Sequence, residues 1–209
     1  GALGPQTAAM LHPYENNSSN SGILMLSTDE ILQYGRLAVL NGLTLAIHAI
    51  GDRANHVVLN AYEQIRKFES VQNITNLNHR IEHVQILSEN DLSRLSENKI
   101  VASMQPIHLI SDMETADQFW GERSRYAYAF KSLQKNKTLL IFGSDAPVES
   151  YNPFIGIYAA LTRRKYDQPK FTAGWYPQEK ITLREIINAY TINPAISSRM
   201  DKNLGSLSI

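Results

Sequence analysis

Short apolar runs alternate with amphipathic stretches along this chain of 209 residues. An apolar run of about five residues between turn-forming residues is typical of a buried strand, whereas apolar residues spaced three and four apart are typical of a helix that buries one side. Buried strands are predicted on this basis over 43–47, 78–84, 99–104 and 138–142. Helices are predicted over 28–41, 53–68, from 88 onward, over about 121–135 and 153–164, and from 182 and 193 onward.

Residues that commonly cap helices mark several of the predicted helix starts. Thr28 is a candidate N-cap, Asn152-Pro153 places a proline in the first turn of a helix, and Thr182 with Glu185 forms the pattern of a capping box. Residues 1–22 are instead rich in Gly, Pro, Asn and Ser, and we predict a long loop there. The chain is therefore expected to be a single domain, in which this loop precedes βα units over 23–209.

The alternation of strands and helices predicts an α/β fold with a parallel sheet. Because helices connect successive parallel strands, we expect both faces of this sheet to be covered. Four βα units are half of an eight-stranded (β/α)8 barrel of the TIM type, or alternatively one small doubly wound sheet. No Gly-x-Gly-x-x-Gly segment follows any predicted strand, which argues against a dinucleotide-binding fold.

Composition and charge exclude several classes of function. The 20 basic and 20 acidic residues give a net charge of zero, so no strong field draws the chain to nucleic acid or to an anionic membrane. No apolar run approaches the ~18 residues of a transmembrane helix. Cysteine is absent, which excludes disulfides, thiolate ligands and a cysteine nucleophile. No basic-then-apolar leader is present, and we expect a cytoplasmic protein with neither nucleic acid nor membrane as a partner.

Polar residues gather where parallel α/β folds place their sites, just past the ends of the strands. His48 follows the apolar run 43–47, and a Gly-Asp pair then opens the next helix, with Asp52 well placed to be its N-cap. A histidine at such a place can instead be half-buried and satisfied by local hydrogen bonds. The sequence around His48 alone does not separate this structural role from a functional one.

The next strand carries two histidines, in the segment His79-Arg-Ile-Glu-His83. Alternation along the strand places His79 and His83 on one face. Arg80 and Glu82 then share the other face, where an ion pair between them explains Glu82 at least as well as catalysis does. His83 stands at the end of the strand and is the natural ligand of this segment.

Two later strands also end in polar residues. Gln105-Pro106 follows the third predicted strand and leads to His108, which either contacts a substrate or lies exposed on a loop. Asp145 comes just after the fourth strand. A carboxylate at the edge of a sheet is costly to desolvate unless it is paired or bound to a metal, although an N-cap or a loop acid is the structural alternative.

The strand-end residues are more informative together than separately. His48, His83 and Asp145 follow three different strands, and parallel strands would bring all three to one mouth. Two imidazoles and a carboxylate suit Zn²⁺ best, and would also suit Fe²⁺ or Mn²⁺. A bound metal lowers the pKa of its water towards about 7, and a free oxygen of Asp145 would accept the proton as the water attacks.

Five motifs occur in a fixed order along the chain. They are His48-Ala-Ile-Gly-Asp52-Arg-Ala54, Arg80-Ile-Glu-His83, Ser103-Met-Gln-Pro106-x-His108, Gly143-Ser-Asp145-Ala-Pro-Val148 and Ala189-Tyr-Thr191-x-Asn193-Pro-Ala195. This set resembles the amidohydrolase superfamily, in particular the branch similar to N-substituted formamide deformylases. The resemblance implies a (β/α)8 barrel that hydrolyses the C–N bond of a small-molecule amide by metal-activated water.

The resemblance also implies roles for individual residues. His48, His83 and Asp145 match the metal ligands of barrel strands five, six and eight, and Asp145 also matches the general base. His108 matches a position of strand seven that contacts the substrate. Further candidates for contacts with the substrate or the ligands are Asp52, Arg53 and Gln105.

The chain departs from the family pattern at its upstream end. The His-x-His pair expected after the first barrel strand and the bridging Lys expected on the fourth would lie before Gly1, so the chain is expected to hold strands five to eight. Two alternatives stay open. The chain is a catalytically silent half-barrel, whose open sheet edges a second copy would cover in a homodimer, or it is a small α/β interaction module with structural histidines.

Overall fold

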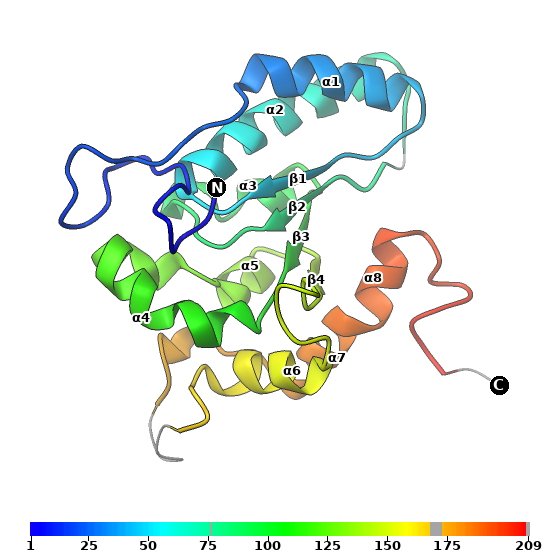
Figure 1. Ribbon diagram of the computed structural model, residues 1–209. Helices are drawn as coiled ribbons and strands as arrows, with labels where there is room; N and C mark the ends of the chain where they lie inside the picture. Colours follow the sequence, from blue (N-terminus) through cyan, green and yellow to red (C-terminus); the bar gives the residue numbers. More distant parts are fainter. Residues whose placement is uncertain (76, 168–172, 208–209) are drawn as a thin grey trace.

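The computed structural model describes residues 1–75, 77–167 and 173–207 of the chain (Figure 1). The strands are β1 (Ala46–Ala49), β2 (Arg80–His83), β3 (Val101–Met104) and β4 (Leu140–Phe142). The helices are α1 (Thr28–Leu40), α2 (Asp52–Val71), α3 (Arg94–Glu97), α4 (His108–Trp120), α5 (Phe130–Lys135), α6 (Pro153–Thr162), α7 (Leu183–Tyr190) and α8 (Ile192–Ser197). Short 3₁₀ helices are η1 (Glu89–Asp91), η2 (Gly121–Tyr126) and η3 (Pro177–Glu179).

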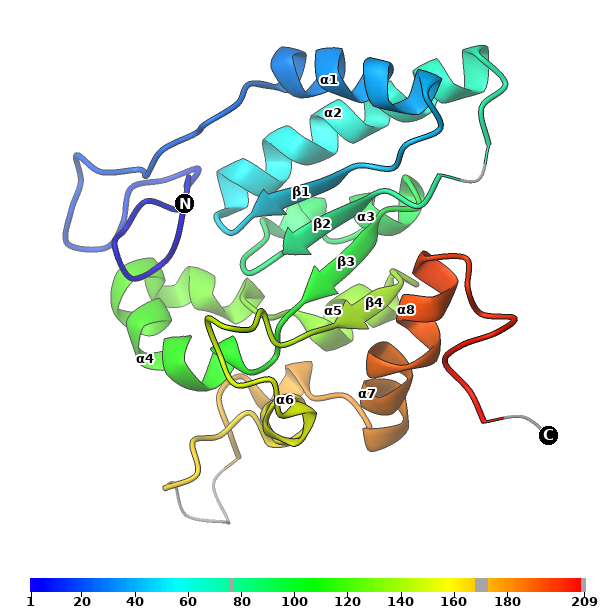
Figure 2. The same ribbon diagram turned by 45° about the vertical axis from the view of Figure 1, so that its right-hand side comes forward.

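The four strands form one parallel sheet in the order β1-β2-β3-β4. Sequence order equals spatial order because each crossover returns the chain beside the strand that it has just left. All four strands run toward the same side of the molecule, where the N-terminal loop and α4 lie (Figure 2). This arrangement confirms the predicted parallel sheet and brings the carboxyl ends of all four strands to one edge.

The two faces of the sheet differ sharply in burial. Side chains of one face are buried, and they include Ala49, Ile81, Ala102, Met104, Leu140 and Phe142. On the opposite face Ala46 and His48 of β1 are exposed, whereas Val101 of β3 is buried. The prediction that both faces would be covered is therefore wrong at β1. The helices lie outside one face, while the other is a concave and partly open surface.

Two predicted helix caps are displaced by one residue. Ser27, rather than Thr28, is the N-cap of α1, because its hydroxyl accepts from the backbone N–H of Glu30 while the Glu30 carboxylate accepts from the backbone N–H of Ser27. Gly51, rather than Asp52, precedes α2. Thr28 and Asp52 are thus the first residues of their helices. The predicted capping box of Thr182 and Glu185 is confirmed at the start of α7.

A helix that begins at His108 was not predicted. Helix α4 occupies 108–120, where the sequence indicated a loop, and the predicted helix over 121–135 is divided into η2 and α5. The buried residues of α4 are Leu109, Met113, Ala116 and Trp120, which repeat at helical spacing. Because His108 is the first residue of α4, it is held on a rigid element and is not an exposed loop residue.

The loop over 1–22 is confirmed, and it folds back onto the start of α2. The carbonyl of Ala9 accepts from the backbone N–H groups of Arg53 and Ala54, two first-turn amides that have no backbone carbonyl partner within the helix. A Cβ on Gly51 would lie 2.0 Å from the same carbonyl oxygen, so the loop can approach this closely only because residue 51 is a glycine. The loop therefore forms one wall at the carboxyl ends of the strands.

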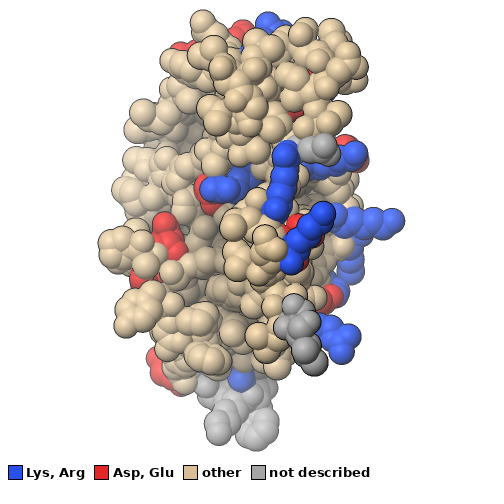
Figure 3. Space-filling view, turned by 90° about the vertical axis from the view of Figure 1, so that its right-hand side faces the viewer, with Lys and Arg blue, Asp and Glu red and all other residues tan. Residues whose placement is uncertain are grey.

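Basic side chains gather on a different side of the molecule. Figure 3 faces the side on which the loop before β1 and helix α8 lie, and Lys and Arg side chains cluster over it. Lys135 is in the last turn of α5, where the partial negative charge of the helix C-terminus favours a cation.

Within the described ranges, no helix is both long enough and apolar enough to cross a bilayer.

Candidate metal centre

A cavity of about 400 Å³ opens at the carboxyl ends of the strands. Polar side chains from three strand ends and from α4 meet at this cavity, and the N-terminal loop closes one side of it. Its lining residues are Ala2, Leu3, Gly4, His48, Ile50, His83, Gln85, His108, Asp112, Asp145 and Val148. The predicted ligands His48, His83 and Asp145 therefore share one cavity, together with His108.

His48 lies within β1 on the open face of the sheet. Its ring meets the ring of His83 nearly edge to face, with centroids 4.5 Å apart. Its Nε2 atom lies 2.9 Å from the carbonyl oxygen of Gly1. This contact joins residues 47 positions apart, so it is not the local hydrogen bond that the structural alternative required. His48 also lines the cavity that His83 lines.

His83 reaches the cavity through an irregular backbone. Simple alternation would place it on the same face as His79, which is fully buried on the helix side of the sheet. The φ angles of His83 and Val84 are instead +75° and +45°, in the left-handed region that residues other than glycine seldom adopt. The predicted shared face of His79 and His83 is therefore wrong, because the strand ends in a turn that directs His83 toward the site.

The protonation of His83 suits a ligand. Burial lowers its pKa below the ordinary value, and the nearby His48 acts in the same direction. A hydrogen bond with Gln105 and the charge of Asp145 oppose this shift. A neutral imidazole is the form that binds a metal ion, so His83 is prepared for that role near neutral pH.

Asp145 and His108 complete the cluster. Asp145 follows β4 with a φ of +59°, and its Oδ2 lies 3.5 Å from Nε2 of His108. One donor atom from each of His83, His108 and Asp145 lies within 4.8 Å of the others. Two imidazole nitrogens and a carboxylate oxygen are donor types that suit a divalent cation such as Zn²⁺. The residues present therefore fit the metal that the sequence motifs imply.

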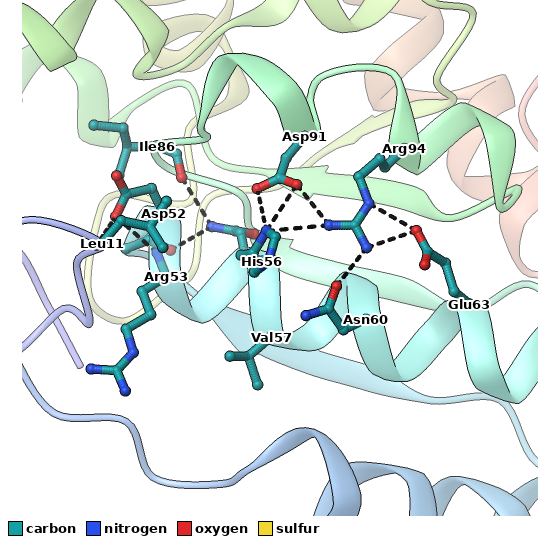
Figure 4. A network of polar contacts seen from close by, with 12 residues as sticks. Leu11, Asp52, Arg53, His56, Val57, Asn60, Glu63, Ile86, Asp91 and Arg94 are labelled. Carbon is teal, nitrogen blue, oxygen red and sulfur yellow. Dashed lines mark hydrogen bonds and ion pairs between the residues drawn. The ribbon is translucent and has the colours of Figure 1, made fainter.

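The remaining predicted site residues are Gln105, Asp52 and Arg53, and they have different surroundings. Gln105 is buried and opposes the lowering of the pKa of His83, although it does not line the cavity. Asp52 is also buried, but its Oδ1 accepts from the backbone N–H groups of Leu11 and Arg53, which joins the N-terminal loop to α2. The Arg53 side chain is exposed and extends away from these contacts (Figure 4). The structure does not bring Asp52 and Arg53 into the lining of the cavity.

Glu82 faces the open side of the sheet, where it pairs with Arg80. The Nε atom of Arg80 lies 2.5 Å from a carboxylate oxygen of Glu82, and both side chains are partly exposed. This is the ion pair that the sequence allowed as an alternative to catalysis. Glu82 does not line the cavity.

Two residues of the cavity were missed from the sequence, Gln85 and Asp112. Asp112 lies one helical turn after His108 on α4, so both side chains face the same way. Its Oδ2 accepts hydrogen bonds from the Tyr128 hydroxyl, at 2.6 Å, and from the Gln85 amide. Burial raises the pKa of Asp112, and these two hydrogen bonds oppose the shift. The i, i+4 spacing of His108 and Asp112 is the signal that would have identified Asp112.

A family model and three known proteins match the sequence of this chain. The model of a family described as "Amidohydrolase family" matches residues 1–209. The chain is 35% identical over 210 residues to Protein LONG AFTER FAR-RED 3 of Arabidopsis thaliana and 30% identical over 208 residues to the putative amidohydrolase YtcJ of Bacillus subtilis. It is 26% identical over 196 residues to an N-substituted formamide deformylase of Arthrobacter pascens. These alignments include 100%, 99% and 93% of this chain, respectively, but only 35%, 38% and 35% of the relatives.

Two solved structures also resemble this chain over nearly its whole length. An uncharacterized metal-dependent hydrolase from Pyrococcus horikoshii has a TM-score of 0.85 and 30% identity, and one from Pyrococcus furiosus has a TM-score of 0.81 and 32% identity. Each comparison covers 99% of this chain and 40% of the solved chain. The chain thus spans well under half the length of the proteins that it matches.

Proposed function

From the premise that this chain belongs to the amidohydrolase family, we propose that it forms the fifth to eighth βα units of a (β/α)8 barrel that hydrolyses an amide-type C–N bond at a metal site. The convergence of His83, His108 and Asp145 within 4.8 Å, with His48 against His83, is the observation that carries this proposal. The open, concave face of a four-stranded parallel sheet supports it, because such a face is the interior of a barrel wall.

The proposed ligands of the metal are His48, His83 and Asp145, one from the end of each of three strands. His83 and Asp145 belong to the cluster whose donors already converge. The ring of His48 lies beside that of His83 on the neighbouring strand, and breaking the contact with Gly1 frees its Nε2. His108, whose ring is 6.2 Å from that of His83, is placed to contact the substrate. Zn²⁺ is the proposed ion, since three protein ligands of this type leave one position open for catalysis.

Each residue around the site has a separate proposed chemical role. A divalent cation held by His48, His83 and Asp145 would lower the pKa of a bound water towards about 7. Asp145 has an oxygen available to accept a proton from the attacking water, which is the task of a general base. His108 lies 3.5 Å from the same carboxylate and can pass a proton onward to the leaving nitrogen. Gln105, which is buried and acts on the pKa of His83, is proposed to orient that imidazole.

The charges that line the cavity indicate a class of substrate. Among the described residues that line it there is no Lys or Arg, whereas Asp112 and Asp145 are both acidic. A bound divalent cation would offset the charge of its ligand Asp145, so Asp112 is the acidic group that an anionic substrate would meet in this partly desolvated space. We therefore infer a neutral or cationic amide as the substrate, in preference to one that carries a carboxylate.

Hydrolysis by the full-length protein tests the proposal directly. Chelator-treated protein would be assayed against a panel of N-formyl and N-acyl amines, before and after Zn²⁺ is restored. We expect amine release that depends on the metal and is absent from a His83→Ala variant. Absence of metal-dependent turnover across the whole panel would contradict the proposed reaction.

The isolated chain provides a second test. If strands β1 and β4 are edges that the remaining barrel strands cover, the isolated chain has exposed edges and an incomplete set of ligands. We then expect weak metal binding by elemental analysis, and self-association by light scattering, in which a second copy covers the edges. A monomer with one tightly bound metal would show instead that four βα units suffice.

A further inference from the structure

We infer that Asn55 is a positioning residue for the metal centre, since its side-chain amide holds together the two segments that follow His48 and His83. The inference rests on the proposed function, because it assigns to Asn55 the spacing of two proposed ligands. Asn55 does not line the cavity and touches neither imidazole. It acts through the backbone that follows each of them.

Asn55 lies in the first turn of α2 and is fully buried. Its Nδ2 atom lies 3.2 Å from the carbonyl oxygen of Ala49 and 3.0 Å from that of Gly51, both in the segment that follows His48. The same nitrogen lies 3.1 Å from the carbonyl oxygen of Ile86, in the loop that follows His83. One amide group therefore joins the exits of two neighbouring strands.

The loop after His83 needs such support. His83 and Val84 both have positive φ angles, a conformation that costs free energy in residues with a Cβ and persists only where surrounding contacts impose it. The backbone N–H of Ile86 also donates to the carbonyl of Ile50, at 3.1 Å. Asn55 and this backbone bond together hold the strained turn against the loop after β1, which directs His83 toward His48.

The chemistry of the contacts explains why this residue is an asparagine. All of its partners are carbonyl oxygens, so the side chain must donate, and an amide nitrogen carries two hydrogens for this purpose. The amide oxygen Oδ1 is buried and accepts no hydrogen bond from the described residues. The contribution of the side chain therefore comes from its NH₂ group, which neither aspartate nor leucine can replace.

The chain offers a matched control two turns further along the same helix. Tyr62 is also fully buried, and its hydroxyl donates to the carbonyl of Arg80 at 2.7 Å and lies 3.3 Å from that of Leu45. Tyr62 thus joins β1 and β2 at the ends far from the cavity, as Asn55 joins them near it. A change at Tyr62 weakens the same pair of strands without touching the loops of the site.

The experiment compares Asn55→Leu and Tyr62→Phe in the full-length protein. The metal-free variants would be titrated with Zn²⁺ against a competing chelator, and the Co²⁺-loaded forms would be examined by visible absorption, which reports the geometry of the ligands. Urea unfolding of the metal-free forms measures stability separately. Asn55→Ala, which removes the donor with less risk of a steric clash, repeats the test if the leucine variant does not fold.

We expect Asn55→Leu to weaken Zn²⁺ binding by about tenfold or more and to change the Co²⁺ spectrum, as is typical when a residue that orients metal ligands is lost. Tyr62→Phe should lower the urea midpoint yet leave both metal measurements close to wild type. Metal affinity that is unchanged in Asn55→Leu, or lost equally in both variants in proportion to stability, would overturn the inference. A wild-type protein that binds no Zn²⁺ would overturn the proposed function and this inference with it.

Discussion

The imidazole of His48 on β1 stands edge to face against the imidazole of His83 on β2, with an angle of 72° between the ring planes. The two residues are 35 positions apart in the sequence, and parallel pairing makes their strands neighbours. His108 lies on the other side of His83, with a ring-to-ring distance of 6.2 Å. His83 is therefore the centre of a row of three imidazoles, and the flanking two have different proposed roles.

Single substitutions of the flanking histidines should separate these roles. We expect His48→Ala to lower Zn²⁺ content and activity together, because it removes a proposed ligand. His108→Ala should retain its metal and lose turnover by about a hundredfold, the scale of a lost general acid or base. Elemental analysis and steady-state kinetics of the full-length variants measure both quantities.

The opposite pattern would reassign the ligands. Loss of metal in His108→Ala, with metal retained in His48→Ala, would indicate that the converging set of His83, His108 and Asp145 holds the ion as it stands. His12→Ala is a suitable control, because His12 does not line this cavity.

Asp112 is expected to select substrates by charge. Its Oδ2 is occupied by Tyr128 and Gln85, while Oδ1 accepts no hydrogen bond from the described residues and belongs to a side chain that lines the cavity. A cationic amide should therefore have a kcat/KM higher than that of a neutral amide of the same shape. Asp112→Asn should reduce this preference by about tenfold, which corresponds to ~1.4 kcal/mol of differential binding.

Glu114→Gln provides the matched control for Asp112. Glu114 is on the same helix, and the substitution removes the same charge, but its side chain is exposed and pairs with Lys165. An equal change in both variants would assign the preference to long-range charge. No preference in the wild type would contradict the proposed class of substrate.

The buried His79 should make folding stability depend on pH. Its Nδ1 accepts from the backbone N–H of Leu45 at 3.0 Å, and its Nε2 donates to Glu69 at 2.7 Å, an arrangement that fits the neutral ring. Burial lowers the pKa of His79 below the ordinary 6.5, and the Glu69 hydrogen bond opposes this shift. Below about pH 6.5 the unfolded chain binds a proton that the folded chain does not, so stability falls as the pH falls.

Urea unfolding of metal-free protein between pH 8 and pH 5 measures this dependence. We expect the free energy of unfolding of the wild type to decline toward pH 5 more steeply than that of His79→Gln, by at most ~1.4 kcal/mol per pH unit for one proton. The comparison of the two proteins removes the contribution of His83, which titrates in the same direction. Parallel curves would contradict the assignment.

Arg94 is expected to stabilise the packing of α3 against α2. Figure 4 shows its guanidinium between Asn60, Glu63 and Asp91, with nitrogen-to-oxygen distances of 2.7–2.8 Å. Asp91 is almost fully buried, and His56 is its other side-chain partner. Arg94→Met should lower the free energy of unfolding by about 2–4 kcal/mol, because it leaves a buried carboxylate poorly compensated.

Exposed Arg184 serves as the control, since Arg184→Met should change stability by less than about 0.5 kcal/mol. Thermal or urea unfolding distinguishes the two variants. Equal effects would mean that the network around Arg94 contributes no more than an ordinary surface charge.

Local patterns in the sequence determined much of the fold. Each of the four predicted strand segments overlaps an observed strand, although β1 begins at Ala46 instead of Leu43 and β2 has a single apolar residue in Arg-Ile-Glu-His. The capping box of Thr182 and Glu185 fixed the start of α7, since its two hydrogen bonds depend only on residues three apart. Helix α4 was missed because Gln105-Pro106 was interpreted as a turn, although Leu109 and Met113 already have helical spacing.

The strand ends and their motifs also predicted four of the residues that gather at one cavity. His48, His83, His108 and Asp145 all line it. The tertiary structure decided how they meet. Left-handed backbone angles, imposed by contacts between segments far apart in sequence, direct His83 into the cavity, and strand alternation could not foresee them.

The same distinction explains the supporting residues. Asp52 belongs to the first sequence motif and Asn55 directly follows it, yet their partners include backbone groups of Leu11 and Ile86, which only folding brings near. Asp112 joins the cavity through a helix that the sequence did not indicate. The sequence specifies which chemical groups are present and which local elements form, because composition and periodicity follow from the order of residues alone. Their distances and shared hydrogen bonds depend on long-range packing, which only the tertiary structure decides.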